Sequence, residues 1–130
     1  MAYTDIDDPS AYFHTQLYTG NATARSITND ANAGDFKPDW VWIKVRNNAN
    51  NHRLFDSSRG GNNDLVSNSN SSESGASGRL TTFNTNGFSL GTNAETNSNT
   101  HNIVSWQWKA NGGTTASNTD GDITSTVQAN

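Results

Sequence analysis

Apolar and polar residues alternate along several short stretches of this chain, and a period of two residues predicts β-strands. The clearest stretch is DWVWIKVR at residues 39–46, directly after Pro38. One face of that strand carries three aliphatic side chains, Val41, Ile43 and Val45. Because the other face carries Trp40 and Trp42, the strand is apolar on both sides. Such a strand lies at the centre of a β-sandwich, or has one face covered by a neighbouring subunit.

The partner that we expect for this strand is NIVSWQWK at residues 102–109. Its apolar positions again alternate, so that Val104, Trp106 and Trp108 share one face. All four tryptophans of the chain therefore fall in two strands. Their spacing suits a sheet packed against a second sheet, and the core is the favoured interpretation. The alternative is an exposed platform on which sugar rings stack, formed by Trp40, Trp42, Trp106 and Trp108.

Further strands are predicted on both sides of this pair. Residues 79–91 form a β-hairpin, because Asn86-Gly87 supplies the positive φ that a tight turn requires. Residues 16–19 and 24–27 form shorter strands around an intervening turn. No window of a dozen residues has apolar positions at helical spacing, so we expect an all-β, antiparallel fold.

Asn, Ser and Gly dominate the remaining stretches, which therefore offer little apolar surface to bury. We expect loops at residues 47–51 and 60–78. Residues 114–130 are expected to be a linker or tail leading to an absent second region. Residues 17–113 then form one β-domain, because 130 residues suffice for one compact core but not for two.

Composition excludes several classes of protein. Charged residues make up only 15% of the chain and the net charge is −4, so no basic stripe is present to bind nucleic acid. The chain has no cysteine, which rules out disulfides and thiolate metal sites. It also lacks a basic leader and an apolar run long enough to span a membrane. We therefore expect a soluble protein made in a cytoplasm, without a membrane partner.

One stretch, HRLFDSSRGG at residues 52–61, contains the residue types of a catalytic site. On a strand, His52 and Asp56 point the same way, with serines close by. The stretch lacks a G-x-S-x-G elbow, however, and a structural role is favoured: Phe55 fills the core, while Arg53 and Asp56 pair or bind loop backbone. Because the histidines are isolated and the acidic residues lie in turn-like contexts, we predict no catalytic residue, metal site or cofactor.

Four segments together resemble a domain of bacteriophage virion proteins, in particular tail-fibre-like proteins of marine phages and cyanophages. The segments are LYTGNATARSI (17–27), FKPDWVWIKVRNNANNHRLFDSSRG (36–60), RLTTFNTNGFSLG (79–91) and VSWQWKANGG (104–113). The resemblance covers most of residues 12–113 in the same order. Its motifs P-D-x-V-W-I-K, H-R-L-F-D-S and W-x-W-K-A are specific in combination rather than singly.

The resemblance implies a β-sandwich of jelly-roll or concanavalin-like type, displayed on a virion as a homo-oligomer, with a trimer favoured. It implies a non-enzymatic structural role as a tail fibre, fibre adaptor or capsid-displayed appendage that aids host attachment. Residues 1–16 would then anchor the chain to other virion proteins, through Tyr3, Ile6, Tyr12 and Phe13. A host surface glycan is the expected ligand of exposed tryptophans. The alternative is a glycan-binding module or lectin that acts outside a virion.

Overall fold

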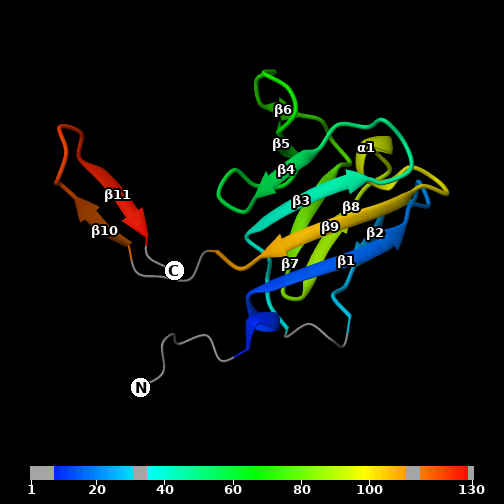
Figure 1. The fold of residues 1–130 in the computed structure, drawn as a ribbon, viewed down its shortest axis with the longest axis horizontal. Coiled ribbons are helices and arrows are strands. Elements are labelled where there is room, and N and C mark those ends of the chain that lie inside the picture. Colours follow the sequence, from blue (N-terminus) through cyan, green and yellow to red (C-terminus); the bar gives the residue numbers. More distant parts are fainter. Residues whose placement is uncertain (1–7, 31–34, 111–114, 129–130) are drawn as a thin grey trace.

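Two antiparallel sheets make up the body of the molecule (Figure 1). The computed structural model describes residues 8–30, 35–110 and 115–128. The larger sheet has the strand order β1 (Phe13–Thr19), β9 (Asn102–Trp108), β3 (Trp40–Val45), β4 (Arg53–Asp56), β5 (Asn63–Val66) and β6 (Ser74–Gly75). The smaller sheet has the order β2 (Arg25–Ile27), β8 (Gly87–Leu90) and β7 (Leu80–Asn84). A separate hairpin consists of β10 (Thr115–Asn118) and β11 (Ser125–Gln128).

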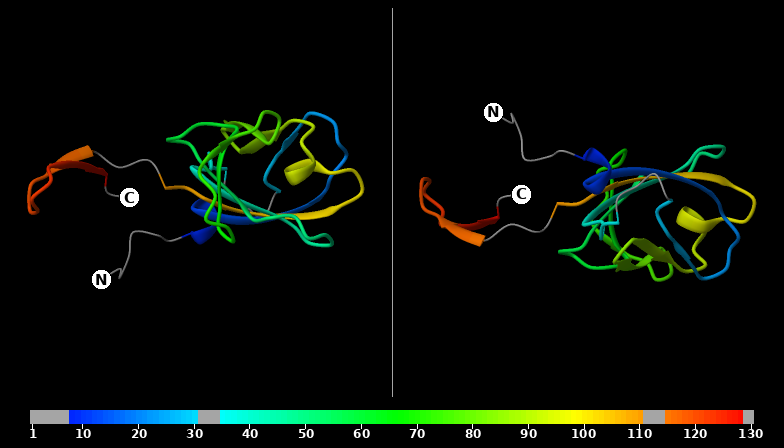
Figure 2. Two further views of the ribbon diagram at one scale, coloured as in Figure 1. Left: turned by 90° about the horizontal axis from the view of Figure 1, so that it is seen from above. Right: turned by 90° about the horizontal axis from the view of Figure 1, so that it is seen from below.

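The two sheets lie in separate layers, and one apolar core joins them (Figure 2). Both layers contribute buried side chains to this core, namely Ile27, Val41, Ile43, Val45, Phe55, Leu80, Phe88, Leu90 and Ile103. The aliphatic face predicted for residues 39–46 is therefore buried, as is Phe55. Helical structure in the described residues is limited to a 3-10 turn, η1 (Pro9–Ala11), and the short helix α1 (Ala94–Asn97). The prediction of a mostly β, antiparallel fold is confirmed.

The predicted neighbours β3 and β9 pair side by side in the larger sheet. Trp40 lies opposite Trp108, and Trp42 lies opposite Trp106. The pairing buries the alternate positions of both strands against the smaller sheet, because successive side chains of a strand point to opposite faces. It also brings the four tryptophans to the same outer face of the larger sheet.

The predicted hairpin is present as β7 and β8, in which Asn84 pairs with Gly87. Gly87 has a φ of +100°, which L side chains rarely adopt. A side chain there would also collide with the backbone carbonyl of Ile27 on the neighbouring strand β2. Glycine at this position thus serves both the turn and the close approach of β2 to β8.

One expectation about a segment needs correction. Residues 60–78, expected to form a loop, contain β5 and β6. Within residues 114–130, expected to be a linker or tail, the structure places β10 and β11. These strands form by backbone pairing and carry few apolar side chains, so alternation does not reveal them. The strands predicted at residues 16–19 and 24–27 are present as parts of β1 and β2, which belong to different sheets. Because β1 begins at Phe13, it also includes the last residues of the expected anchoring segment.

A buried network of charges fixes β5 against its neighbours. Asp64 is fully buried and forms ion pairs with Arg53 and Arg79. Arg53 on β4 reaches Asp64 at 2.9 Å and Glu95 of α1 at 3.1 Å. Arg53 therefore does not pair with Asp56, because Arg53 points into the molecule. Asp56 instead pairs with the side chain of Arg59 and accepts from its backbone N–H at 2.8 Å, so the alternative expectation, a bond to loop backbone, is confirmed for Asp56.

Candidate functional site

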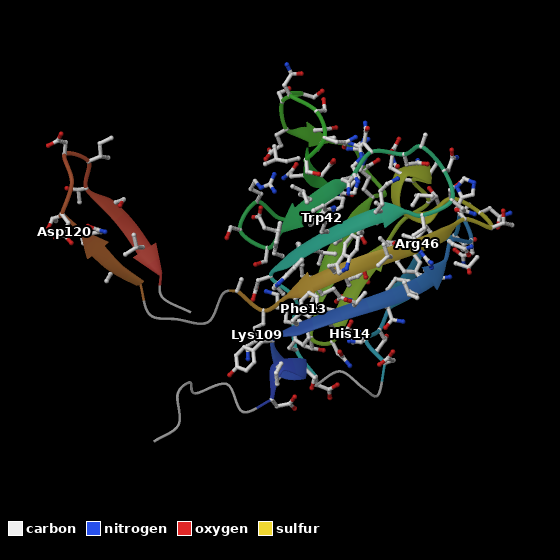
Figure 3. The ribbon with its side chains drawn as sticks, in the orientation of Figure 1. Phe13, His14, Trp42, Arg46, Lys109 and Asp120 are labelled. Carbon is white, nitrogen blue, oxygen red and sulfur yellow. The ribbon has the colours of Figure 1, made fainter. Side chains whose placement is uncertain are left out.

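The outer face of the larger sheet carries a continuous set of apolar side chains from five neighbouring strands. We call it the aromatic patch, and it consists of Phe13 and Leu17 on β1, Trp106 and Trp108 on β9, Trp40 and Trp42 on β3, Leu54 on β4 and Leu65 on β5. Figure 3 shows Phe13 and Trp42 on the side of the sheet that is turned toward the viewer. Among the described elements, none lies in front of this face in Figure 1.

The rings of the patch pack against one another across the strands. The ring centroids of Trp40 and Trp108 are 4.5 Å apart, and Phe13 lies 5.0 Å from Trp108 on the other side. Trp42 and Trp106 meet edge to face at 5.4 Å. Interplanar angles of 34° to 62° among these pairs mean that the rings form no flat platform. The cluster is a ridged apolar surface.

The position of the tryptophans corrects the favoured interpretation of the sequence. Their rings were expected in the core, but β3 and β9 turn aliphatic and small polar side chains inward instead. Each tryptophan is partly buried by its neighbours on the outer face. The patch is open to solvent at its margins, where Phe13 is 40%, Leu17 56% and Leu65 41% exposed.

Leu17, Leu54 and Leu65 belong to this surface but were not predicted to do so from the sequence. Leu17 shares the face of Phe13, and Leu54 points opposite to the buried Phe55, so the alternation does contain a signal. It was ambiguous because β1 carries apolar residues on both faces, with Tyr18 turned toward the core.

The polar groups beside the patch bind within the chain. The indole Nε1 of Trp42 donates to Nδ1 of His52 at 2.9 Å. The ammonium of Lys44 donates to three backbone carbonyls between residues 45 and 50, at 2.7 to 3.1 Å. The carboxylate of Asp56 accepts from the side chain of Arg59. These three groups are therefore engaged within the chain rather than available to a ligand.

The contact between Trp42 and His52 allows a prediction of the pH range in which the His52 ring takes up a proton. Partial burial lowers the pKa of His52, and the Lys44 ammonium lowers that pKa further. Since protonation of Nδ1 would break the bond from Trp42, we expect a midpoint below the usual 6.5 in an NMR titration of the His52 ring. The stability contributed by neutral His52 is then present above pH 6.5 and is lost as the pH falls toward the lowered pKa.

Two variants test the cause of this shift. Lys44→Met removes the neighbouring charge and should raise the midpoint of His52, while Trp42→Phe removes the indole donor and should raise it as well. A midpoint at or above 6.5 in the unaltered chain would contradict the prediction.

The side chains of His52, Asp56 and Ser57 in the stretch 52–61 each bind a different partner rather than one another. His52 accepts from Trp42, and Asp56 binds Arg59. The hydroxyl of Ser57 donates to the carboxylate of Asp39 at 2.8 Å. The arrangement that the sequence raised, with His52 and Asp56 beside a serine, is therefore not assembled.

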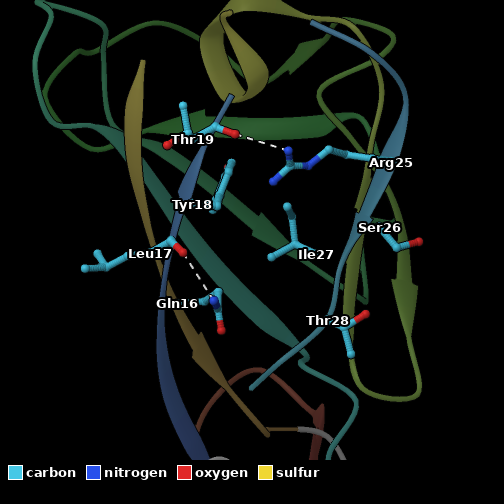
Figure 4. A pocket seen from close by; sticks show the side chains of 8 residues that line it. All are labelled: Gln16, Leu17, Tyr18, Thr19, Arg25, Ser26, Ile27 and Thr28. Atoms are coloured by element: carbon cyan, nitrogen blue, oxygen red, sulfur yellow. Dashed lines mark hydrogen bonds between the residues drawn. The ribbon is translucent and has the colours of Figure 1, made fainter. Parts of the chain in front are cut away.

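An open cleft of about 410 Å³ lies between β1 and β2, which are edge strands of the two sheets (Figure 4). Gln16 donates to the backbone carbonyl of Leu17 at 3.2 Å, and Arg25 donates to that of Thr19 at 3.1 Å. These side chains occupy backbone acceptors of an edge strand, which is a means of preventing unwanted strand pairing. We therefore interpret the cleft as the place where these side chains protect the edge of β1 from pairing with another strand.

The expected anchoring residues are described in part. Tyr3 and Ile6 lie outside the described residues. Tyr12 is 38% exposed and follows η1, and Lys109 lies 5.3 Å from the centre of its ring. Phe13 belongs to the aromatic patch through its contact with Trp108.

In the part of the chain that the structure describes, no group of three or more His, Asp or Glu side chains lies together in a way that could hold a metal ion. None of the described helices has the length and apolar character needed to cross a membrane.

Comparison with known proteins identifies a family but no activity. Residues 8–130 match the model of a family described as a domain of unknown function, DUF7483. No curated protein and no solved structure matches the chain. A function must therefore be inferred from the residues and the surface of the molecule.

Proposed function

Because the chain belongs to the DUF7483 family, whose function is unknown, we propose from its surface and its sequence that it is a non-enzymatic structural component of a bacteriophage virion. In this role it is a tail fibre, fibre adaptor or capsid-displayed appendage that aids host attachment. Its two sheets form a β-sandwich of jelly-roll or concanavalin-like type. It is held in the virion as a homo-oligomer, with a trimer favoured, and contacts other virion proteins through its N-terminal segment.

The observation that supports this proposal most directly is the aromatic patch. Large contiguous apolar surfaces on a folded chain are typical of sites that bind another molecule. Here the neighbouring polar groups of Trp42, Lys44 and Asp56 are bound within the chain, which suits a packing surface better than a site of chemical turnover. The resemblance of four sequence segments to tail-fibre-like proteins is the reason for proposing that the chain belongs to a bacteriophage virion.

The test is to look for the chain in virus particles. Particles of the phage that encodes it would be purified on a density gradient, digested for mass spectrometry, and labelled with gold-conjugated antibody against the chain. We expect the chain at a fixed ratio to the major capsid protein, with gold at one defined part of the particle. Purified, infectious particles without the chain would overturn the proposal.

The second candidate function is a glycan-binding module that acts outside a virion. It is favoured by the position of Trp40, Trp42, Trp106 and Trp108, which lie on the solvent side of the sheet rather than in the core. A glycan array probed with the purified chain tests it, with Trp108→Ala as the variant expected to lose any signal. Binding to sugars by a chain that is absent from particles would favour this candidate over the first.

A further inference from the structure

We propose that the aromatic patch is the surface through which copies of this chain pack against one another. The inference rests on the proposed function and deepens it, because it names the contact that holds the homo-oligomer together. The larger sheet has one face covered by the smaller sheet, whereas its other face, which carries the patch, has no cover within the described residues.

The patch has the size that a specific interface needs. It spans five strands, or about 20 Å across the sheet, and about 14 Å along the strands, given the ordinary spacing of strands and residues. With the side chains that project beyond these limits, it covers on the order of 500 Å² per copy. Two such surfaces in full contact bury on the order of 1,000 Å², the area at which specific interfaces begin, and in a ring each copy divides its patch between two neighbours.

The order of side chains across the patch makes it complementary to itself. The β1 side presents Leu17, the centre presents the tryptophans of β9 and β3, and the far side presents Leu54 and Leu65. The β1 side of one copy therefore finds an equally apolar surface on the β4 and β5 side of the next, with the tryptophans between them. Contacts of this head-to-tail kind are heterologous, and they form a closed ring when the rotation between neighbouring copies closes.

The chemistry of the patch favours a protein surface over a glycan as its occupant. Sugar recognition needs convergent polar groups that fix the orientation of the ligand. Beside this patch, the indole of Trp42, the ammonium of Lys44 and the carboxylate of Asp56 are already bound within the chain. The rings are tilted against one another, and the leucines at both sides add area that a stacked sugar would not use.

The experiment measures the native mass of the full chain by light scattering and sedimentation, over a range of concentrations. We expect the unaltered chain at a multiple of 14.0 kDa, threefold for the trimer, and the Leu17→Asp and Leu65→Asp variants each at 14.0 kDa. Both leucines are exposed in the single chain, so the variants should keep its far-UV spectrum. Tryptophan emission of the unaltered chain should shift to longer wavelength when dilution separates the copies.

Ile123→Asp is the matched control. Ile123 is an aliphatic residue that is 83% exposed, but it lies between β10 and β11 and outside the patch. We expect this variant to keep the native mass of the unaltered chain. If Ile123→Asp separates the copies while Leu17→Asp does not, the proposal is overturned and the contact lies at the hairpin.

Other occupants of the patch appear as distinct outcomes. A chain that stays at 14.0 kDa at all concentrations overturns the proposal. In that case, a change of tryptophan emission on deletion of residues 1–7 would assign the patch to the chain's own N-terminal segment. A change on addition of glycans would assign it to a sugar. If the chain is oligomeric but absent from virus particles, only the proposed function is overturned. If the chain is present in particles but monomeric, only this inference is overturned.

Discussion

Replacing Asp64 with asparagine is expected to lower the free energy of unfolding by about 3–5 kcal/mol, because the change leaves buried positive charge without its counter-ion. Asp64 is fully buried between Arg53 and Arg79, whose side chains are themselves almost inaccessible. Arg53 keeps Glu95 as a partner in the variant, but Arg79 keeps only the neutral hydroxyl of Ser74 among these contacts. Since domains of this size are stabilised by about 5–15 kcal/mol, the loss is a large part of the total.

This prediction is measured by urea denaturation in the Leu17→Asp background, so that association does not contribute to the measured stability. Glu95→Gln is the control, because Glu95 is partly exposed and its pairing with Arg53 should be worth less than about 1 kcal/mol. A loss below about 1 kcal/mol for Asp64→Asn would contradict the prediction. A triple variant with apolar residues at Arg53, Asp64 and Arg79 should regain much of the stability, because it removes the unpaired charge itself.

Replacing Phe55 with alanine is expected to destabilise the fold by about 3–5 kcal/mol, since it opens a cavity where the two sheets meet. Phe55 is fully buried and belongs to the core that β4 shares with the smaller sheet. Its neighbour Leu54 points to the opposite face, into the aromatic patch. Leu54→Ala should therefore cost less than about 1.5 kcal/mol in the single chain, because Leu54 is only partly buried there.

The two variants on one strand separate the core from the patch. Both would be compared by urea denaturation in the Leu17→Asp background, and by native mass in the unaltered background. We expect Phe55→Ala to lose stability, and Leu54→Ala to weaken association more than stability. Equal losses of stability from the two substitutions would show that the outer face is as well packed within one chain as the core is.

Alternation along the chain was sufficient to predict the parts of the fold that the core requires. Residues 39–46 and 102–109 carry strong period-two patterns, and they pair as β3 and β9 in the predicted way. The turn at Gly87 was also predictable, because a positive φ is a local requirement of the backbone. These features depend on a few neighbouring residues, so their signal is complete within a short stretch of sequence.

Pairing over long distances could not be predicted in the same way. β5 is polar and was expected to be a loop, yet Asp64 is buried there because Arg53 and Arg79 reach it from other segments. β1 and β2 are close in sequence but join different sheets. No local pattern records such partners, since a strand completes its hydrogen bonds with whichever segment the fold brings beside it.

In the candidate site, too, some features follow from the local sequence and others only from the packing of distant segments. The sequence by itself determined that four tryptophans occupy two adjacent strands, and that the strand at residues 39–46 is apolar on both faces. Only the tertiary structure decided which face the smaller sheet covers, and it covers the aliphatic side of β3. The physical reason is that a strand apolar on both faces gives no preference by its pattern. The choice follows from how Ile27, Leu80 and Phe88 of the smaller sheet fill the space against the aliphatic face, which leaves the tryptophans outside.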